Sequence, residues 1–253
     1  MNLLVVDIGN SSVHFGVITD GTVASRWDGR HRDAGLAVLE PSLRDWLAKQ
    51  AYVSAAVIGS VVPGLVGPTS VLIQELCGAV PDVLDRGCKL PFTNLYSQGQ
   101  AGIDRLANVA AACGKGFMPC VIVDAGTAIT VELLTGAKEF SGGVIFPGAE
   151  AASRSLAGRT ALLPEVLATD EYRPRIESLE TNDAIMSGGL LGCAGAIDRF
   201  VAEGRTVLGQ KATAILTGGT AERFSTLCEG PFLIEKNLTL AGLALLWEHN
   251  FST

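Results

Sequence analysis

The sequence predicts an α/β protein made of two similar halves, each with a mixed sheet flanked by helices. Two segments support this prediction: VVDIGNSSVHFGV at residues 5–17 and VIVDAGTAITVELL at residues 121–134. Each reads as an apolar strand, an Asp-x-Gly turn with hydroxyl-bearing residues, and a second apolar strand. The second aspartate, Asp124, follows the first, Asp7, by 117 residues in a chain of 253. This offset is close to half the chain and indicates a duplication.

The first half begins with three consecutive antiparallel strands. Apolar runs at residues 3–7 and 15–19 form the first pair, and the TDG turn at residues 19–21 leads into a third strand at 22–27. Helix then alternates with strand. In order, we expect a helix over 34–50, a buried strand over 55–63, a helix from after Pro68 to Gly78, and an Ala-rich helix over 102–116.

The second half repeats strand, hairpin and helix from Cys120. After the hairpin at 121–134 we expect a helix over 181–204, a buried strand over 212–219 and a last helix over 237–250. Because domains most often have roughly 100 to 150 residues, the expected domains are 1–117 and 118–253. Residues 157–177 contain two prolines and are expected to form a loop that orders on binding or a dimer contact.

Composition limits the possible partners. The net charge of −7 and pI near 5.0 give no general attraction to nucleic acid or to anionic lipid, so we expect neither as a partner. The six cysteines are scattered, without a CxxC pair. The apolar run at the N-terminus is far shorter than the roughly 18 residues of a membrane helix, so a cytoplasmic location is expected.

The first Asp-x-Gly turn is a candidate phosphate site. Gly9 allows close approach of a ligand to the backbone, and Asn10, Ser11 and Ser12 add short donors and exposed amides. The alternative is a tight turn with polar residues for solubility. Because the same pattern occurs twice, and each copy follows a strand where ligands of α/β sheets bind, the phosphate interpretation is favoured. Gly218 and Gly219 also follow a strand, and they either lie near a ligand or form a plain strand-to-helix turn.

The two aspartates are candidate cation ligands. Asp7 and Asp124 each follow at least three apolar residues, and an unpaired charge at the edge of a core is costly. Magnesium on a nucleotide, or a monovalent ion near the phosphates, would satisfy either carboxylate. The alternative is a carboxylate that accepts hydrogen bonds from its own turn.

The segment QAGIDRLAN at 100–108 places Gly102 and Asp104 at a helix start. Asp104 can be a capping residue there. Together with Arg105, whose guanidinium suits a carboxylate or phosphate, it can also act as a base beside an anion clamp. The spacing alone does not separate these two interpretations.

Together these pieces resemble the type III pantothenate kinases of the acetate and sugar kinase, heat-shock protein and actin superfamily. The matching segments follow in order along nearly the whole chain: DIGNSS, SVVP, GIDR, DAGTAIT, GGVIFPG, RTALLP, TNDAIMSG, TGG and LTLAGL. The resemblance implies two actin-like, ribonuclease H-like halves with a cleft between them. It also implies a homodimer and ATP-dependent phosphorylation of pantothenate, the first step of coenzyme A biosynthesis.

The resemblance also implies roles for individual residues. Asp104 would be the general base, and Asp124 would hold the activating potassium or ammonium ion. Thr181 would contact the substrate across the dimer interface, beside a pantothenate site that Gly102, Ile103, Asp104 and Arg105 line. Magnesium would accompany the ATP. The residues that would contact ATP are Asp7, Ile8, Gly9, Asn10, Ser11, Ser12, Val13, His14 and Thr127.

The chain departs from the family pattern before the GIDR segment. YSQGQAGIDR is one residue shorter than the usual YxxPxxLGxDR, with Gly99 for Pro and Ala101 for a larger apolar residue. Leu106 stands where Trp is common, and Glu132 where Asp is common. The catalytic residue types are unchanged, whereas Tyr96 loses the spacing of a substrate contact.

Two other functions fit the same fold. One is a nucleotide-binding regulatory protein without kinase turnover, because actin-like folds also host such functions. The other is a hydrolase of phosphate anhydrides, which would need a positioned water and no carboxylate-substrate pocket. Asp104 and Arg105 favour the kinase.

Overall fold

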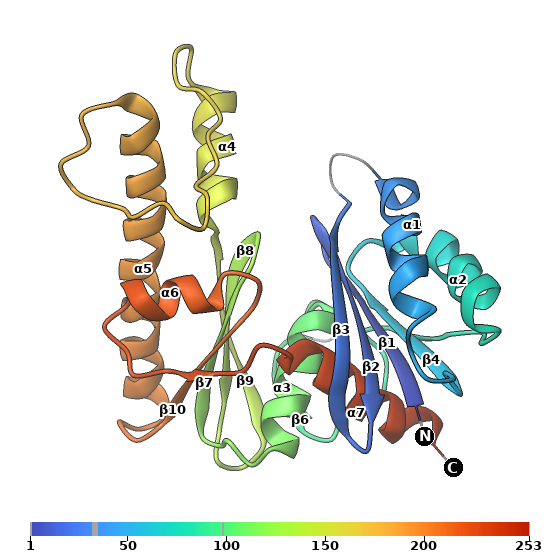
Figure 1. Ribbon diagram of the computed structural model, residues 1–253. Coiled ribbons are helices and arrows are strands. Elements are labelled where there is room, and N and C mark those ends of the chain that lie inside the picture. The colour runs from blue at the N-terminus through green and yellow to red at the C-terminus, as the bar shows by residue number, and fades with distance from the viewer. Residues whose placement is uncertain (1, 32–34, 98, 253) are drawn as a thin grey trace. The chain divides into compact units, whose positions relative to one another are not determined.

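The computed structural model describes residues 2–31, 35–97 and 99–252. It divides into two compact units (Figure 1). The first unit contains Met1–Phe117, Lys138–Phe140 and Asn237–Thr253, and the second contains Met118–Ala137 and Ser141–Lys236. Each unit has a mixed sheet with helices, as the sequence predicts.

The first unit has a five-stranded sheet in the order β3-β2-β1-β4-β5. The first three strands are antiparallel neighbours, and β4 and β5 are parallel additions. Asp20 and Gly21 have φ of 50° and 73°, the geometry that closes a two-residue hairpin, which confirms the predicted turn. The strands are β1 (Asn2–Ile8), β2 (Ser12–Thr19), β3 (Thr22–Arg30), β4 (Ala55–Ser60) and β5 (Asp82–Leu84).

Helices cover both faces of this sheet. The alternate residues Leu4, Val6 and Ile8 of β1 belong to the core that packs under α1 (Gly35–Leu47) and α2 (Pro63–Cys77). On the opposite face, Leu240 and Leu243 of α7 (Leu238–Phe251) contact the strands at Gly16 and Gly59. The helix α3 (Ile103–Gly114) packs on α7.

Helix α2 begins earlier than the sequence suggests. It starts at Pro63 and runs through Pro68, although we expected it to start after Pro68. Proline is well suited to a first helical position, because its missing N–H has no intrahelical partner there. The turn after Pro68 is held by the buried Thr69 and Ile73. Gly78 ends α2 with φ of 71°, as expected. Of the preceding helix, predicted over 34–50, Ala34 lies outside the described residues.

The last helix lies in a different unit from the one predicted. The sequence-based division at 117/118 assigned residues 118–253 to the second domain. Helix α7 lies in the first unit. A Cβ at Gly242 would overlap the carbonyl group of Ala107 in α3, and Thr239 Oγ1 donates to Asn108 Oδ1 at 2.9 Å. Because α7 is apolar on nearly every side, its sequence does not specify the sheet on which it packs.

The second unit repeats the topology of the first. Its strands follow the order β9-β8-β7-β10-β11, which corresponds to β3-β2-β1-β4-β5. The short β6 (Thr93–Asn94) pairs with Glu139 and Phe140 at the start of β9. The strands are β7 (Cys120–Ala125), β8 (Ala128–Leu134), β9 (Glu139–Pro147), β10 (Thr213–Thr217) and β11 (Leu233–Ile234). The helices are α4 (Ala149–Arg159), α5 (Thr181–Leu208) and α6 (Ala221–Leu227).

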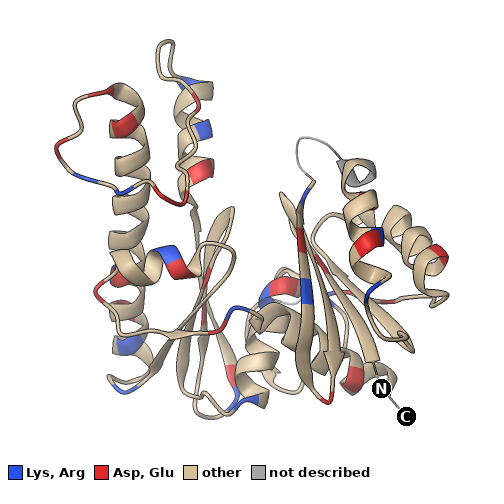
Figure 2. Ribbon diagram, in the orientation of Figure 1, with Lys and Arg blue, Asp and Glu red and all other residues tan. Residues whose placement is uncertain are grey.

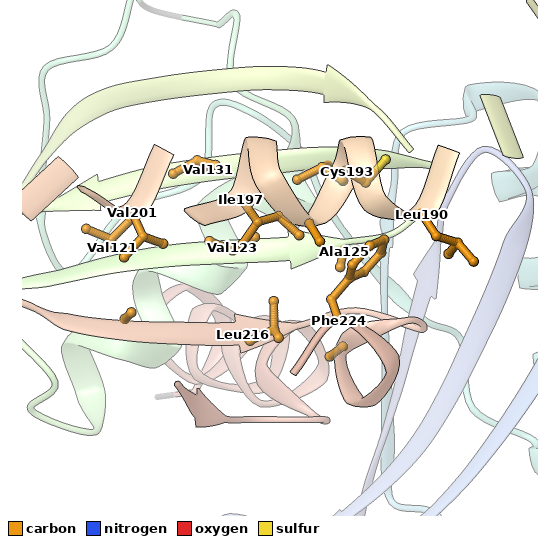
Figure 3. Packing of buried hydrophobic residues seen from close by; sticks show 14 residues of the cluster. Val121, Val123, Ala125, Val131, Leu190, Cys193, Ile197, Val201, Leu216 and Phe224 are labelled. Carbon is orange, nitrogen blue, oxygen red and sulfur yellow. The ribbon is translucent and has the colours of Figure 1, made fainter. Parts of the chain in front are cut away.

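Helix α5 forms the core of the second unit. Its apolar side chains Leu190, Cys193, Ile197 and Val201 form one buried cluster with Val121, Val123 and Ala125 of β7 (Figure 3). By length and composition, α5 is the one helix in the described ranges that could cross a membrane. One face of α5, which includes Leu190, Ile197 and Val201, packs on the sheet of the second unit.

Charged residues are mixed along both units. Lys and Arg are distributed over several elements, with Asp and Glu among them (Figure 2). The charge of a bound anion must therefore be balanced locally.

Candidate functional site

The first Asp-x-Gly turn connects β1 to β2 and is closed by a histidine. The Gly9 N–H donates to the Ser12 carbonyl at 2.9 Å. The side chain of the buried His31 donates from Nε2 to the Gly9 carbonyl at 2.8 Å. The backbone N–H of His31 donates to the Ser11 carbonyl at 3.1 Å. Since an imidazole and two strands hold it, the turn has a defined shape.

The side chains of this turn divide between core and surface. Ile8 and Val13 are buried in the core and Ser11 is buried, so these three residues of the predicted ATP site are not exposed. Asp7, Ser12 and His14 are partly exposed. An added Cβ at Gly9 would lie 3.4 Å from the Ser12 carbonyl oxygen, an ordinary contact, so the packing of the turn itself does not demand glycine at this position.

The second turn, between β7 and β8, is packed by backbone. Gly148 donates its N–H to the Thr127 carbonyl at 3.0 Å. A Cβ at Gly148 would lie 2.5 Å from the Gly126 carbonyl oxygen, so only glycine fits. Gly218 has φ of 94°, and a Cβ there would overlap the Asp124 carboxylate. The turn after β10 and the Asp124 turn therefore lie side by side in the second unit.

Asp124 lies in a row of oxygen-bearing side chains across the sheet. It pairs with Thr217 of β10 on one side and with Thr130 of β8 on the other, so the three side chains share a face. The hydroxyl oxygens of Thr130 and Thr217 are buried and make no hydrogen bond to any residue that the structure describes. Buried hydroxyls normally have a partner. This row therefore fits a ligand that binds oxygen atoms.

Asp104 lies in the first turn of α3, as predicted. Its Oδ1 accepts the Arg105 N–H at 2.8 Å, but the N-cap residue is Gly102 and the helix has no side-chain cap hydrogen bond. A Cβ at Gly102 would overlap this carboxylate and lie 3.3 Å from Val61 Cγ1. The Val61 N–H in turn donates to the Ile8 carbonyl at the end of β1. The structure thus brings the GIDR helix start and the first turn to the same edge of the first sheet.

The electrostatics of Asp104 favour proton binding. Burial raises the pKa of its carboxyl above the ordinary value of 3.8. The Arg105 N–H donor and the positive charges of Arg105 and Arg86 act in the opposite direction but do not cancel the effect. A carboxylate with a raised pKa is a better base.

Arg105 is buried against aromatic rings. Its guanidinium carbon is 4.9 Å from the centre of the Tyr96 ring and 5.6 Å from that of Phe140. Those two rings are stacked, with centres 5.5 Å apart. Tyr96 therefore supports Arg105 through a cation–π contact.

Thr181 is exposed at the first position of α5. It lies in the second unit, as do Asp124 and Thr127, whereas the first turn and residues 102–105 belong to the first unit. Ile103 is buried. Groups of three or more His, Cys, Asp or Glu that could hold a metal are absent from the described residues, so a cation there would also need hydroxyl, backbone or phosphate oxygens.

Among the features of these sites that sequence reasoning missed, three lie next to predicted site residues. They are the closure of the first turn by His31, the charge of Arg86 near Asp104, and the hydroxyl row beside Asp124. Each depends on residues that are distant in sequence. Of these, only the hydroxyl row beside Asp124 could have been predicted. Aligning the strand that ends in Thr217 with the Asp124 hairpin would have indicated it.

Comparison with known proteins identifies the family. The family model described as type III pantothenate kinase matches residues 3–203. The chain belongs to the type III pantothenate kinase family. The family assignment made from the sequence motifs is confirmed.

Members of this family align over the whole chain. The type III pantothenate kinase of Finegoldia magna is 32% identical, with 98% of this chain and 97% of that protein covered. That of Rubrobacter xylanophilus is 33% identical, with 99% and 98% covered.

Solved structures confirm the two-domain actin-like fold. A protein from Campylobacter jejuni described as a Baf family transcriptional activator has a TM-score of 0.59 at 19% identity, with 97% of this chain and 98% of that chain covered. The activator of 2-hydroxyisocaproyl-CoA dehydratase from Clostridium difficile, with bound ADPNP, has a TM-score of 0.54 at 10% identity, with 97% and 93% covered. At these identities the likeness concerns the fold. As a member of a kinase family, the protein transfers a phosphoryl group from ATP to a small molecule.

Asp104→Asn should stabilise the protein without ligands. Because the folded state binds the Asp104 proton more tightly than the unfolded chain does, stability falls as pH rises through the raised pKa. The variant should therefore melt at a higher temperature than wild type near neutral pH, and the difference should shrink toward pH 3.8. Thermal melts over this pH range measure it, with the exposed Asp45→Asn as control. An Asp104→Asn protein that melts at or below the wild-type temperature at neutral pH would contradict the burial argument.

Proposed function

We propose that this protein phosphorylates the primary hydroxyl of pantothenate to give 4′-phosphopantothenate, the first step of coenzyme A biosynthesis. The observation that carries the proposal is Asp104, a partly buried carboxylate with a raised pKa at a helix start. It adjoins the first Asp-x-Gly turn through Val61. Family membership supplies the substrate class.

Asp104 acts as the general base. A carboxylate at this position accepts the hydroxyl proton as the oxygen bonds to phosphorus. Gly102 keeps the space that this carboxylate occupies, because any larger residue would displace it. Gly102, Ile103 and Arg105 line the pantothenate site, where Ile103 contributes backbone and the buried Arg105 contributes positive charge near the substrate carboxylate.

ATP binds at the first turn, Asp7 to His14, and at Thr127 of the second. The first turn offers amides and hydroxyls, and a ligand close to Gly9 would explain a glycine that packing does not require. Magnesium accompanies the phosphates and neutralises part of their charge. Residues of the chain hold and orient the phosphates in both turns.

Asp124 holds a monovalent cation, potassium or ammonium. Its carboxylate is flanked by the buried Thr130 and Thr217 hydroxyls, which are oxygen donors suited to such an ion. The ion would supply positive charge beside the ATP phosphates in an acidic protein.

The active form is a homodimer in which Thr181 contacts pantothenate bound to the partner protomer. The loop that precedes Thr181 carries three apolar side chains, Leu162, Ile176 and Leu179, that are each at least 91% exposed. Exposed apolar side chains of this size can mark an interaction surface, and a second copy would cover them. We place the enzyme in the cytoplasm, where its ATP is available.

The regulatory alternative is not favoured by the comparisons, since the relatives that align over the full chain are named as kinases. The Campylobacter protein described as a transcriptional activator shares the fold at 19% identity. No separate observation supports hydrolysis of phosphate anhydrides.

The kinase assay tests the proposal. Purified protein with ATP, magnesium, potassium and pantothenate should yield 4′-phosphopantothenate. Asp104→Asn should reduce kcat by roughly 10² to 10⁴-fold, the range for loss of a general base, while ATP binding stays near wild type. Asp45→Asn should keep full activity. Release of ADP and free phosphate without regard to pantothenate would favour the hydrolase, and near-normal turnover of Asp104→Asn would remove Asp104 as the base.

Asp124→Ala should weaken activation by potassium. The expected result is a potassium titration shifted to higher concentration by roughly tenfold or more, since a charged ligand is lost. The exposed Glu203→Ala on α5 is the matched control. A titration curve for Asp124→Ala that coincides with wild type would refute the cation role.

Leu179→Asp should convert the dimer to monomers, because a buried charge would oppose association. Sedimentation or light scattering measures the change, and Val80→Asp, at an exposed valine of the first unit, should leave the dimer intact. A monomeric wild-type protein at assay concentration would contradict the homodimer.

A further inference from the structure

Arg105 of α3 carries its positive charge inside the first unit, against two aromatic rings. The residue is only 4% exposed. Tyr96 and Phe140, whose ring centres lie 4.9 Å and 5.6 Å from the guanidinium carbon, belong to the same unit. Both distances are within the roughly 6 Å of a cation–π contact. A buried charge is costly unless other groups interact with it, and the negative faces of the rings supply part of that interaction.

The two rings also support each other. Tyr96 and Phe140 are stacked, with their planes 6° apart. The backbone holds the stack on both sides of Tyr96, because the Leu95 N–H donates to the Phe140 carbonyl at 3.0 Å and the Tyr96 N–H donates to Asn94 Oδ1 at 3.0 Å. The short pairing of β6 with β9 thus brings the rings together beside α3.

A guanidinium has two kinds of contact surface. Aromatic rings contact its flat face, whereas carboxylates bind the N–H groups along its edge. Rings on the face therefore fix the plane of Arg105 without competing for the edge that binds an anion. Because Asp104 is the preceding residue, this plane is fixed next to the proposed general base.

We propose that Tyr96 and Phe140 are positioning residues for the substrate: their stacked rings hold the Arg105 guanidinium in the orientation in which it binds the substrate carboxylate. The rings act through Arg105. They determine how strongly the site prefers a substrate with a carboxylate over the same molecule without one. This inference rests on the proposed binding of pantothenate at residues 102–105.

Tyr96 is the member of the stack to vary, because it is partly exposed whereas Phe140 is fully buried. Tyr96→Leu removes the ring and keeps an apolar side chain. The KM for pantothenate, measured with saturating magnesium–ATP, should rise roughly tenfold, which is about 1.4 kcal/mol and the order of a desolvated cation–π contact. The kcat and the KM for ATP should stay near wild type.

Two matched variants define what the ring contributes. Tyr96→Phe keeps the ring and lacks only the hydroxyl, so it should keep the wild-type KM for pantothenate. Tyr52→Leu removes a tyrosine of the same unit that is 82% exposed, and it should leave every kinetic constant unchanged.

Two further measurements separate this role from a structural one. The N-methylamide of pantothenate lacks the carboxylate, so Tyr96→Leu should bind it with the wild-type Kd in a competition titration. In an Arg105→Gln protein, the additional Tyr96→Leu change should not raise the KM for pantothenate further, because the group that the ring holds is already absent.

An unchanged KM for pantothenate in Tyr96→Leu would overturn the inference. A Tyr96→Phe protein as impaired as Tyr96→Leu would also overturn it, because the hydroxyl would then be the group that matters. The same holds if the methylamide is weakened as much as pantothenate, or if the two changes are additive. Should Tyr96→Leu fail to fold, Tyr96→Met gives the same decision, since methionine adapts to irregular space.

The kinase assay separates this result from the proposed function. A wild type that phosphorylates pantothenate, with a KM that the loss of the ring does not change, contradicts only the positioning role. A wild type that does not phosphorylate pantothenate contradicts the proposed function, and the positioning role with it.

Discussion

The alternation of side chains along β1 and β7 is the constraint on which both candidate turns depend. In β1, Leu4, Val6 and Ile8 face α1 and α2, so Asp7 must face the side that α7 covers. In β7, Val121, Val123 and Ala125 face α5, and Asp124 takes the equivalent position. A slip of one residue in either strand would move the carboxylate into an apolar core. The burial of each core therefore fixes the direction of the acid at the end of its strand.

The two turns share this geometry but are stabilised differently. In the first, the His31 side chain holds the Gly9 carbonyl, and His14 joins Ser12 to Asp28. In the second turn, backbone groups pack closely around Gly148 and Gly218, so neither position has room for a Cβ. The duplicated frame has thus kept its topology, while the chemistry of each turn has become distinct. The first turn has ionisable side chains around its hydroxyl, and the second has hydroxyls around its carboxylate.

Much of the fold could be predicted because local patterns determine it. The two hairpins, helix α3 and the long helix α5 follow from strand runs, turn residues and apolar periodicity. Helix α7 could not be placed, since a helix that is apolar on nearly every side fits any sheet face, and its partners Ala107 and Asn108 lie far away in sequence. The early start of α2 depends on whether packing around Ile73 outweighs the cost of Pro68, which no local pattern reports.

The candidate site could likewise be predicted only where a local pattern determines it. Asp104 and the two turns could be found because a short motif carries each of them. The contact of Arg105 with Tyr96 and Phe140 was hidden, because it brings together three segments of the chain. His31 and Asp28 were likewise hidden, since their roles depend on the register of β2 and β3.

The central proposal is that each Asp-x-Gly turn contacts the phosphates of ATP. Amide hydrogen exchange of the whole protein, with and without magnesium–ATP, tests it most directly. The account predicts that ATP slows exchange in peptides that cover the first turn and in peptides that cover the second. Slower exchange at one turn alone, or at neither, in a protein that binds ATP would contradict it.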